Sequence, residues 1–412
     1  STLQHGTFQV PTAPSAVAVS LQHLKLERPA FERFPLPGRV YETVVLMLYF
    51  AILMGIASSP TLVALAAGPE PGGWLVLAFA IYLQLVAMIV VVNYARAILK
   101  LRRTRYRAQP PLNSVPFAIL IPMYNEDVEV LQTGLESINS QPQAHNVTVI
   151  VGFEERAGKE GNAKREKAVR EIFSNVKAVH IFTHPAKVPG HIKGCGSNQS
   201  WAMNQFLQGT QEDISDWVFM KVDAQVVMQP GLLTELEHRM VAWREHRRPT
   251  VWQPLVLHTI NNDRAFAVGS LYAQTVELFV IGIFGQPLIS LFLFGQYAMP
   301  MDQYVRAGMH HPSVMAEDQA ITIQAAWTNR SLSVQPLDHA VAKAPPLGDN
   351  VCEAIGETLA QDTRFFVGSV LILPWNLLHN PSTLSCCSFV LNSLFLRHFT
   401  TVAMPIMSLQ SM

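Results

Sequence analysis

The stretch DWVFMKVDAQVV, residues 216–227, decides the fold, because it contains a mostly apolar run of strand length that ends in a lone acid, Asp223. An apolar run of this length is typical of a buried strand. An acid at the end of a strand is commonly a turn residue. The alternative is that Asp223 binds a positively charged group, and the neighbouring segments distinguish the two interpretations.

Segments of strand type alternate with segments of helix type on both sides of this stretch. The predicted strands are 115–123, 146–153, 176–182, 216–222 and 251–257, and the predicted helices are 126–140, 164–173, 198–208 and 230–246. Such alternation predicts a mostly parallel α/β sheet with helices on both faces, in a domain of residues 112–345. In sheets of this kind, ligands bind beyond the carboxyl ends of the strands.

The composition narrows the class of protein. Lys plus Arg and Asp plus Glu both number 30, so the chain lacks the basic excess that is usual in nucleic-acid-binding proteins. Hydrophobic residues make up 49% of the 412 residues, and charged residues make up only 15%, against about 25% in soluble domains. The four cysteines have no spacing typical of a zinc site or a disulfide framework, which predicts free thiols. These figures favour a membrane protein.

Two stretches without charge, 43–67 and 74–95, are each long enough to cross a bilayer. Basic residues flank the pair on both outer sides, and the loop between the stretches has none. The positive-inside rule therefore predicts a transmembrane hairpin over 41–96, with the segment 1–40 and the domain that follows both in the cytosol. Residues 355–412 are predicted to form an interfacial helix and the start of a C-terminal transmembrane region.

Polar residues follow several predicted strands, and the carboxyl ends of parallel strands meet at one edge of a sheet. Acids that gather there, away from the outer faces of the helices, indicate a binding site. The residues concerned are Tyr124, Glu126, Glu154, Glu155 and Asp223. The run Lys-Gly-Cys-Gly-Ser-Asn at 193–198 precedes a helix, where small residues allow the backbone to approach a phosphate. Its spacing differs from that of a Walker loop.

In chain order, five segments resemble motifs of the family-2 glycosyltransferases, in particular the membrane-embedded branch that includes cellulose, chitin and hyaluronan synthases. IPMYNED resembles P-x-Y-N-E, IKGCGSN resembles K-x-x-x-x-N, and VDAQ resembles D-x-D. MAEDQAI resembles the E-D motif of the catalytic base, and QDTRF resembles Q-x-x-R-W. The resemblance implies a nucleotide-diphospho-sugar transferase domain (GT-A, Rossmann-like) in the cytosol, flanked by transmembrane helices.

The resemblance also implies a role for each matching residue. Asp318 would be the catalytic base, with Glu317 beside it, and Asp223 with Gln225 would hold Mg²⁺ or Mn²⁺. The donor would contact Tyr124, Glu126, Glu154, Glu155, Lys193 and Asn198. The acceptor and the diphosphate would contact Gln361, Arg364 and Phe365. The sequence departs from the family where Gln225 replaces the second Asp, where Glu154 or Glu155 replaces an Asp, and where Phe365 replaces Trp.

The implied reaction is inverting transfer from a UDP-sugar to a growing β-linked polysaccharide. The alternatives are transfer of one sugar to a lipid, as in the related ceramide glucosyltransferases, and an inactive membrane scaffold that partners a synthase. The implied partners are the donor, a polysaccharide or lipid acceptor and the bilayer, and the resemblance leaves room for a homo-oligomer. A multi-pass protein of the plasma membrane or the Golgi is expected. Because Asp223 and Asp318 must share one site, the apolar stretch 277–296 is interpreted as a buried or interfacial helix.

Simpler interpretations exist for some of these residues. Glu317 and Asp318 precede a helix-like segment, where acids cap the helix and favour its dipole. Gln361 and Arg364 lie three residues apart and fit the polar face of a helix. His184 and the pair at 310–311 lack the spacing of a metal site and are expected in turns or at the surface.

Overall fold

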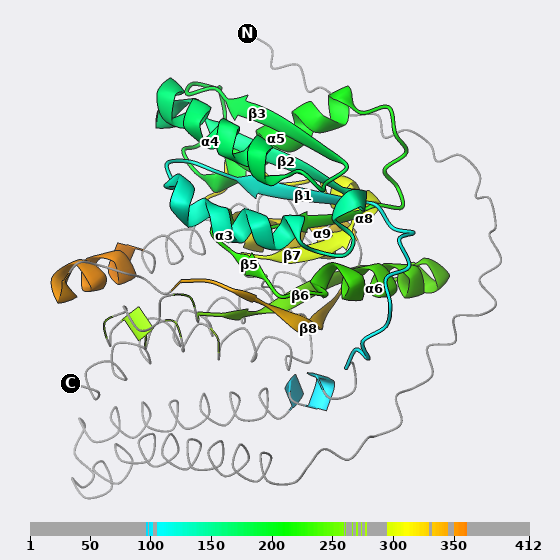
Figure 1. Ribbon diagram of the computed structural model, residues 1–412. Coiled ribbons are helices and arrows are strands. Elements are labelled where there is room, and N and C mark those ends of the chain that lie inside the picture. Colours follow the sequence, from blue (N-terminus) through cyan, green and yellow to red (C-terminus); the bar gives the residue numbers. More distant parts are fainter. Residues whose placement is uncertain are drawn as a thin grey trace, which may run out of the picture.

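The structure is a computed structural model. It describes residues 105–258, 295–328, 332–344 and 350–360, together with 96–97, 99–101, 260, 266, 269–270, 273 and 277. In this part of the chain, eight strands form one mixed sheet in the order β3-β2-β1-β4-β7-β6-β8-β5 (Figure 1).

The bounds of the strands are β1 Phe117–Pro122, β2 Val147–Glu154, β3 Ala178–His184, β4 Val218–Lys221, β5 Val227–Met228, β6 Thr250–Leu257, β7 Tyr297–Pro300 and β8 Ser333–Ala342. The helices are α3 Val128–Asn139, α4 Lys159–Ile172, α5 Cys195–Gly209, α6 Leu232–His246, α8 Met301–Arg306 and α9 Glu317–Thr328. Two short 3-10 helices, η1 Ala144–Asn146 and η2 Glu155–Ala157, flank β2.

The direction of the strands fixes which residues meet at each edge of the sheet. Strands β1, β2, β3 and β4 are parallel, β7 is antiparallel to both β4 and β6, and β8 is parallel to β6. The carboxyl ends of β4, β6 and β8 therefore lie at the same edge as the amino end of β7. Residues that follow β4 and β8 and residues that precede β7 can consequently contribute to one site.

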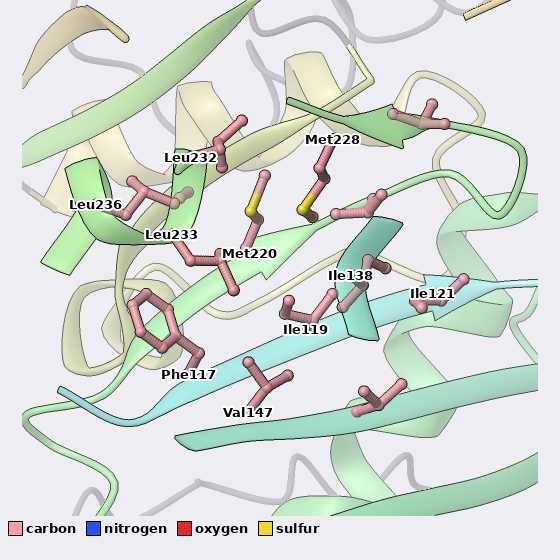
Figure 2. Packing of buried hydrophobic residues seen from close by; sticks show 14 of the residues in the cluster. Phe117, Ile119, Ile121, Ile138, Val147, Met220, Met228, Leu232, Leu233 and Leu236 are labelled. Atoms are coloured by element: carbon pink, nitrogen blue, oxygen red, sulfur yellow. The ribbon is translucent and has the colours of Figure 1, made fainter. Parts of the chain in front are cut away.

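Apolar side chains cover both faces of the sheet, because its central strands are buried on both sides. On one face, Phe117, Ile119 and Met220 pack with α3, α4 and α6, and Figure 2 shows Ile138 of α3 and Leu236 of α6 among them. On the other face, α5, α8 and α9 pack on the alternate residues of the same strands. The predicted sheet with helices on both faces is confirmed.

Five strands are observed close to their predicted positions, but β5, β7 and β8 were not predicted. Strand β8 contains Pro336 and pairs with β6 across an irregularity next to Pro254. Proline has no N–H group to donate to a ladder, so its presence weakens the sequence signal of a strand. Strand β7 has only four residues.

A buried carboxylate supports the irregular part of β8. Glu235 of α6 has no exposed surface, and its carboxylate oxygens accept hydrogen bonds from the backbone amides of Asp338 and His339. His339 Nδ1 lies 2.8 Å from the same carboxylate, and Arg239 pairs with it at 2.9 Å. These amides lie where β8 loses its register with β6, so Glu235 replaces the missing ladder partners.

None of the helices in the described part combines the length with the apolar character that a membrane crossing requires. The predicted spans at 43–67 and 74–95 lie outside the described residues, and so does nearly all of 277–296. Of the predicted C-terminal region, only residues up to 360 are described, and residues 351–360 are helical.

We predict that Glu235→Gln lowers the free energy of unfolding by about 2–4 kcal/mol, because a neutral amide cannot accept all the bonds that the buried carboxylate accepts. Burial alone raises the pKa of Glu235, but His339 and Arg239 outweigh it and hold the pKa below its ordinary value of 4.5. The stabilisation is therefore present above that value and is lost as the pH falls through the lowered folded-state pKa. Urea denaturation at pH 7 measures the loss.

The matched control is Glu245→Gln, on the exposed end of the same helix, which should change stability by less than about 0.5 kcal/mol. Equal stability of the two variants would contradict the role given to Glu235.

Candidate active site

The centre of the site is a buried lysine. Lys221 is the last residue of β4, and its side chain is only 2% exposed. Side chains alternate along a strand, so Lys221 lies on the same face as Phe219, toward α5 and α9. A buried ammonium group is costly unless acids surround it. Three acids do so here.

Asp223, which follows β4, has both carboxylate oxygens engaged. Its Oδ1 lies 2.8 Å from Lys221 Nζ. Its Oδ2 accepts hydrogen bonds from Gln296 Nε2 at 2.7 Å and from Lys343 Nζ at 3.2 Å. Gln296 precedes β7 and Lys343 follows β8, so three strands of the sheet contribute to this cluster.

Glu317 and Asp318 begin α9 and reach the same lysine. Lys221 Nζ lies 3.5 Å from Asp318 Oδ1 and 4.0 Å from Glu317 Oε1. Asp318 Oδ2 accepts a hydrogen bond of 2.9 Å from the amide of Gly295. Gly295 has a φ of 53°, in the left-handed region that favours glycine, and a side chain there would lie 3.4 Å from Asp223 Oδ2. Both acids do lie in the first turn of a helix, but Asp318 also bonds to a separate segment.

The start of α5 closes one side of the cluster. A Cβ atom on Gly196 would lie 2.9 Å from the carbonyl oxygen of Val314 and 3.1 Å from Glu317 Cβ. A side chain at residue 196 would therefore push α5 away from the segment that leads into α9. The neighbouring Cys195 Sγ accepts a hydrogen bond from Gln199 at 2.9 Å. Burial, followed by Glu317, raises the pKa of the Cys195 thiol, so it stays neutral.

Burial and ion pairing set the protonation of the cluster. Burial by itself disfavours the charged form of Lys221, but Asp223 and then Asp318 outweigh it and raise its pKa well above the ordinary value. Burial raises the pKa of Asp223 less than Lys221 and Lys343 lower it, so this pKa falls well below its usual range. For Glu317, burial and then Asp318 raise the pKa. Burial also raises the pKa of Asp318. The site therefore holds the ion pair of Lys221 and Asp223 beside two acids that take up a proton more readily than usual.

Behind the cluster, His310 lies between two tyrosines. Its Nε2 is 2.5 Å from the hydroxyl of Tyr297, and its Nδ1 is 2.7 Å from the hydroxyl of Tyr304. His310 lies in a bend that follows α8, but it is 1% exposed, so the expectation of a surface role is wrong. Burial and then the charge of Lys221 lower its pKa well below the ordinary value, which keeps the imidazole neutral.

A second polar group lies at the ends of β1 and β2. The Tyr124 side chain is exposed, and the Arg156 guanidinium lies 5.9 Å from the centroid of its ring. Arg156 also forms an ion pair with Glu154, which is nearly buried. Glu126 accepts a hydrogen bond from the amide of Tyr124 at 2.7 Å, and Glu155 accepts one from the amide of Ala186 at 2.8 Å.

His184, at the end of β3, joins this second group. Its Nε2 lies 2.9 Å from His191 Nδ1, the two rings stack, and Trp201 packs edge-on against His184. His184 Nδ1 lies 3.9 Å from Glu154. The residue is 4% exposed, so the expectation of a turn or surface role is also wrong here.

The phosphate-facing run begins α5. Lys193 is exposed just before the helix. Asn198 is buried, and its amide donates hydrogen bonds to the backbone carbonyls of Met123 at 3.3 Å and Gly152 at 2.8 Å. The side chain of Asn198 therefore joins the ends of β1 and β2. Its assignment to the donor stays a prediction, as does that of Lys193.

The predicted acceptor residues Gln361, Arg364 and Phe365 lie outside the described residues. Gln225, predicted to share a metal ion with Asp223, is half-buried after β4.

A divalent cation does not fit Asp223 as this structure arranges it. Metal ions of this kind bind oxygen ligands that carry free lone pairs and negative charge. Here two ammonium groups occupy the positions beside the two carboxylate oxygens, and they would repel a cation. Among the described residues, no group of three or more His, Cys, Asp or Glu side chains is arranged to hold a metal ion.

Four residues of these two groups were not predicted: Lys221, Lys343, Gln296 and Arg156. Lys221 had the clearest signal in the sequence, because it is the only charged residue inside the apolar run 217–222. Lys343 and Gln296 flank strands that were not predicted, so no pattern in the sequence placed them beside Asp223.

No protein-family model and no curated protein matches the chain. Solved structures do resemble it at low identity. The mannosyltransferase PcManGT from Pyrobaculum calidifontis, solved with GDP-Man and Mn²⁺, has 14% sequence identity and a TM-score of 0.47, over 80% of this chain and 76% of that one. TarS from S. aureus has 13% identity and a TM-score of 0.40, over 69% of this chain and 44% of that one. Both similarities are too distant to support an argument about this chain.

We predict that Lys221→Met lowers the free energy of unfolding by about 3–5 kcal/mol, because it leaves Asp223 and Asp318 without the cation that they surround. Urea denaturation followed by tryptophan fluorescence measures this loss. Lys167→Met removes a lysine that is 77% exposed on α4, and it should leave stability nearly unchanged. A Lys221→Met chain as stable as the wild type would refute the central role of this lysine.

Proposed function

We propose that this chain is an inverting glycosyltransferase, which transfers a sugar from a UDP-sugar to a growing β-linked polysaccharide at the cytosolic face of a membrane. One observation carries the proposal. Asp223 and Asp318, which match two separate motifs of the family-2 enzymes, contact the same Lys221 Nζ at 2.8 Å and 3.5 Å. Both lie at the sheet edge where ligands of α/β proteins bind.

Asp318 is suited to the role of general base. Its Oδ2 accepts a hydrogen bond from the amide of Gly295, and 18% of its side chain is exposed. In the proposed step, the carboxylate of Asp318 takes the proton of an acceptor hydroxyl. The hydroxyl oxygen then bonds to the anomeric carbon as the bond from that carbon to the diphosphate oxygen breaks. The electron pair of the broken bond leaves with the nucleoside diphosphate.

The second polar group supports a nucleotide at the ends of β1 and β2. Tyr124 offers an exposed aromatic face beside Arg156, and such a face can stack on a base. The nearly buried Glu154 forms an ion pair with Arg156 and so fixes the position of the guanidinium. Glu126, Glu155, Lys193 and Asn198 complete the proposed donor site.

The membrane setting and the polymeric product rest on the sequence. The uncharged stretches 43–67 and 74–95 and the segment QDTRF at 361–365 support an enzyme beside a bilayer, with Gln361, Arg364 and Phe365 near the acceptor. Transfer of one sugar to a lipid uses the same chemistry. The size of the product distinguishes the two acceptors.

We predict that Asp318→Asn lowers the rate of transfer by about 10²–10⁴-fold, because the amide cannot take a proton, while UDP binding changes little. The measurement is UDP release by the full-length chain over a panel of UDP-sugars, followed by sizing of the product. Asp302→Asn is the matched control, since Asp302 also lies in the first turn of a helix on the same face of the sheet.

Equal loss in both variants would indicate a general effect on folding. Full activity of Asp318→Asn would remove Asp318 from the role of base. A folded wild-type chain that releases UDP from no donor would favour the inactive scaffold.

A further inference from the structure

In the proposed reaction, the negative charge of the leaving diphosphate must be balanced by a metal ion or by a cationic side chain. The residues around Asp223 favour a side chain. In this structure, the acid that matches the metal-binding motif is already neutralised on both oxygens, by Lys221 on Oδ1 and by Lys343 on Oδ2. Gln296 donates a further hydrogen bond to Oδ2. The side chain at the second position of the motif is Gln225, which adds no negative charge. At Asp223 itself, the two adjacent ammonium groups thus oppose the binding of a divalent cation.

The two lysines differ in what they can reach. Lys221 is 2% exposed and is enclosed by acids, so it can act on a ligand only through the field it creates. The side chain of Lys343 is 25% exposed, and an ammonium group has three donors. One of them is directed to Asp223, and within the part of the chain that the structure describes no second partner of the ammonium group is seen.

The backbone holds Lys343 in place. Its amide donates a hydrogen bond of 2.8 Å to the carbonyl of Leu257 at the end of β6, and its own carbonyl accepts one from Ile260. Asp223 then fixes the end of the side chain. An ammonium group positioned in this way, at the edge where ligands bind, is preorganised to face developing negative charge.

We propose that Lys343, held against Asp223, supplies the positive charge that a divalent cation would otherwise supply, so that this chain binds its nucleoside diphosphate and transfers the sugar without a metal ion. This inference rests on the proposed function. In the step, Asp318 gains the acceptor proton, the acceptor oxygen bonds to the anomeric carbon, and the bond to the diphosphate breaks. The negative charge that the leaving diphosphate gains is balanced by the ammonium of Lys343, which keeps its proton.

The test measures UDP binding to the purified full-length chain by calorimetry, in EDTA and in Mn²⁺, together with UDP release from the active donor. The variants are Lys343→Gln, which removes the charge, and Lys343→Arg, which keeps it. Lys177→Gln is the matched control, because Lys177 forms an exposed ion pair with Glu212 on the surface. Thermal melting shows that each variant is folded.

The wild-type chain and Lys177→Gln are expected to bind UDP in EDTA with an affinity within about twofold of that in Mn²⁺. Lys343→Gln should bind about tenfold or more weakly in EDTA, and Lys343→Arg should restore most of the loss. UDP release should follow the same order.

Two results would overturn the inference while the proposed function stands. One is wild-type binding and release that disappear in EDTA and return with Mn²⁺. The other is a Lys343→Gln chain that binds UDP in EDTA as tightly as the wild type. A folded wild-type chain that binds no UDP and releases none from any donor, with or without Mn²⁺, would refute both the proposed function and this inference.

Discussion

The ammonium group of Lys221 is the constraint on which the arrangement of the site depends. A cation buried at the end of a central strand is tolerated only where carboxylates surround it, since desolvation otherwise costs several kcal/mol. Asp223 from the end of β4 and the pair at the start of α9 meet this requirement from distant parts of the chain. The position of α9 is therefore tied to the sheet by charge as well as by apolar packing.

The mixed direction of the strands brings further residues to the acids that surround Lys221, and so completes the site. An all-parallel sheet would need a crossover between each pair of strands, whereas the antiparallel β7 begins at the edge where β4 and β8 end. Gly295 and Gln296 thus reach Asp318 and Asp223 from the amino end of a strand. Lys343 reaches the same carboxylate from the carboxyl end of β8. Glu235 contributes indirectly, because it supports the irregular segment of β8 that precedes Lys343.

The fold was predictable where one segment contains its own signal. Strands β1, β2 and β4 are apolar runs because both of their faces are buried, and the helices between them have apolar faces of helical period. The acids Asp223, Glu317 and Asp318 were found for a similar reason, since each lies in a short motif. Lys343 and Gln296 were not found, because their role depends on strand pairings between distant segments. The buried state of His184 and His310 likewise depends on contacts from other elements.

The carboxylate of Asp223 contacts both Lys221 and Lys343. Because Lys221 is buried and Lys343 is partly exposed, we assign a structural role to Lys221 and a role in ligand binding to Lys343. Lys221 stabilises the fold, because its buried ammonium group forms ion pairs with Asp223 and Asp318 that compensate its charge. Lys343 shares Asp223 with Lys221 and Gln296, so Asp223 orients it without neutralising it alone. Positive charge beyond what this carboxylate needs is then directed toward the open edge of the sheet. In the proposed function, the motif at Asp223 marks where the charge of a diphosphate would be balanced, and the contacts of Asp223 favour a lysine as the group that balances it.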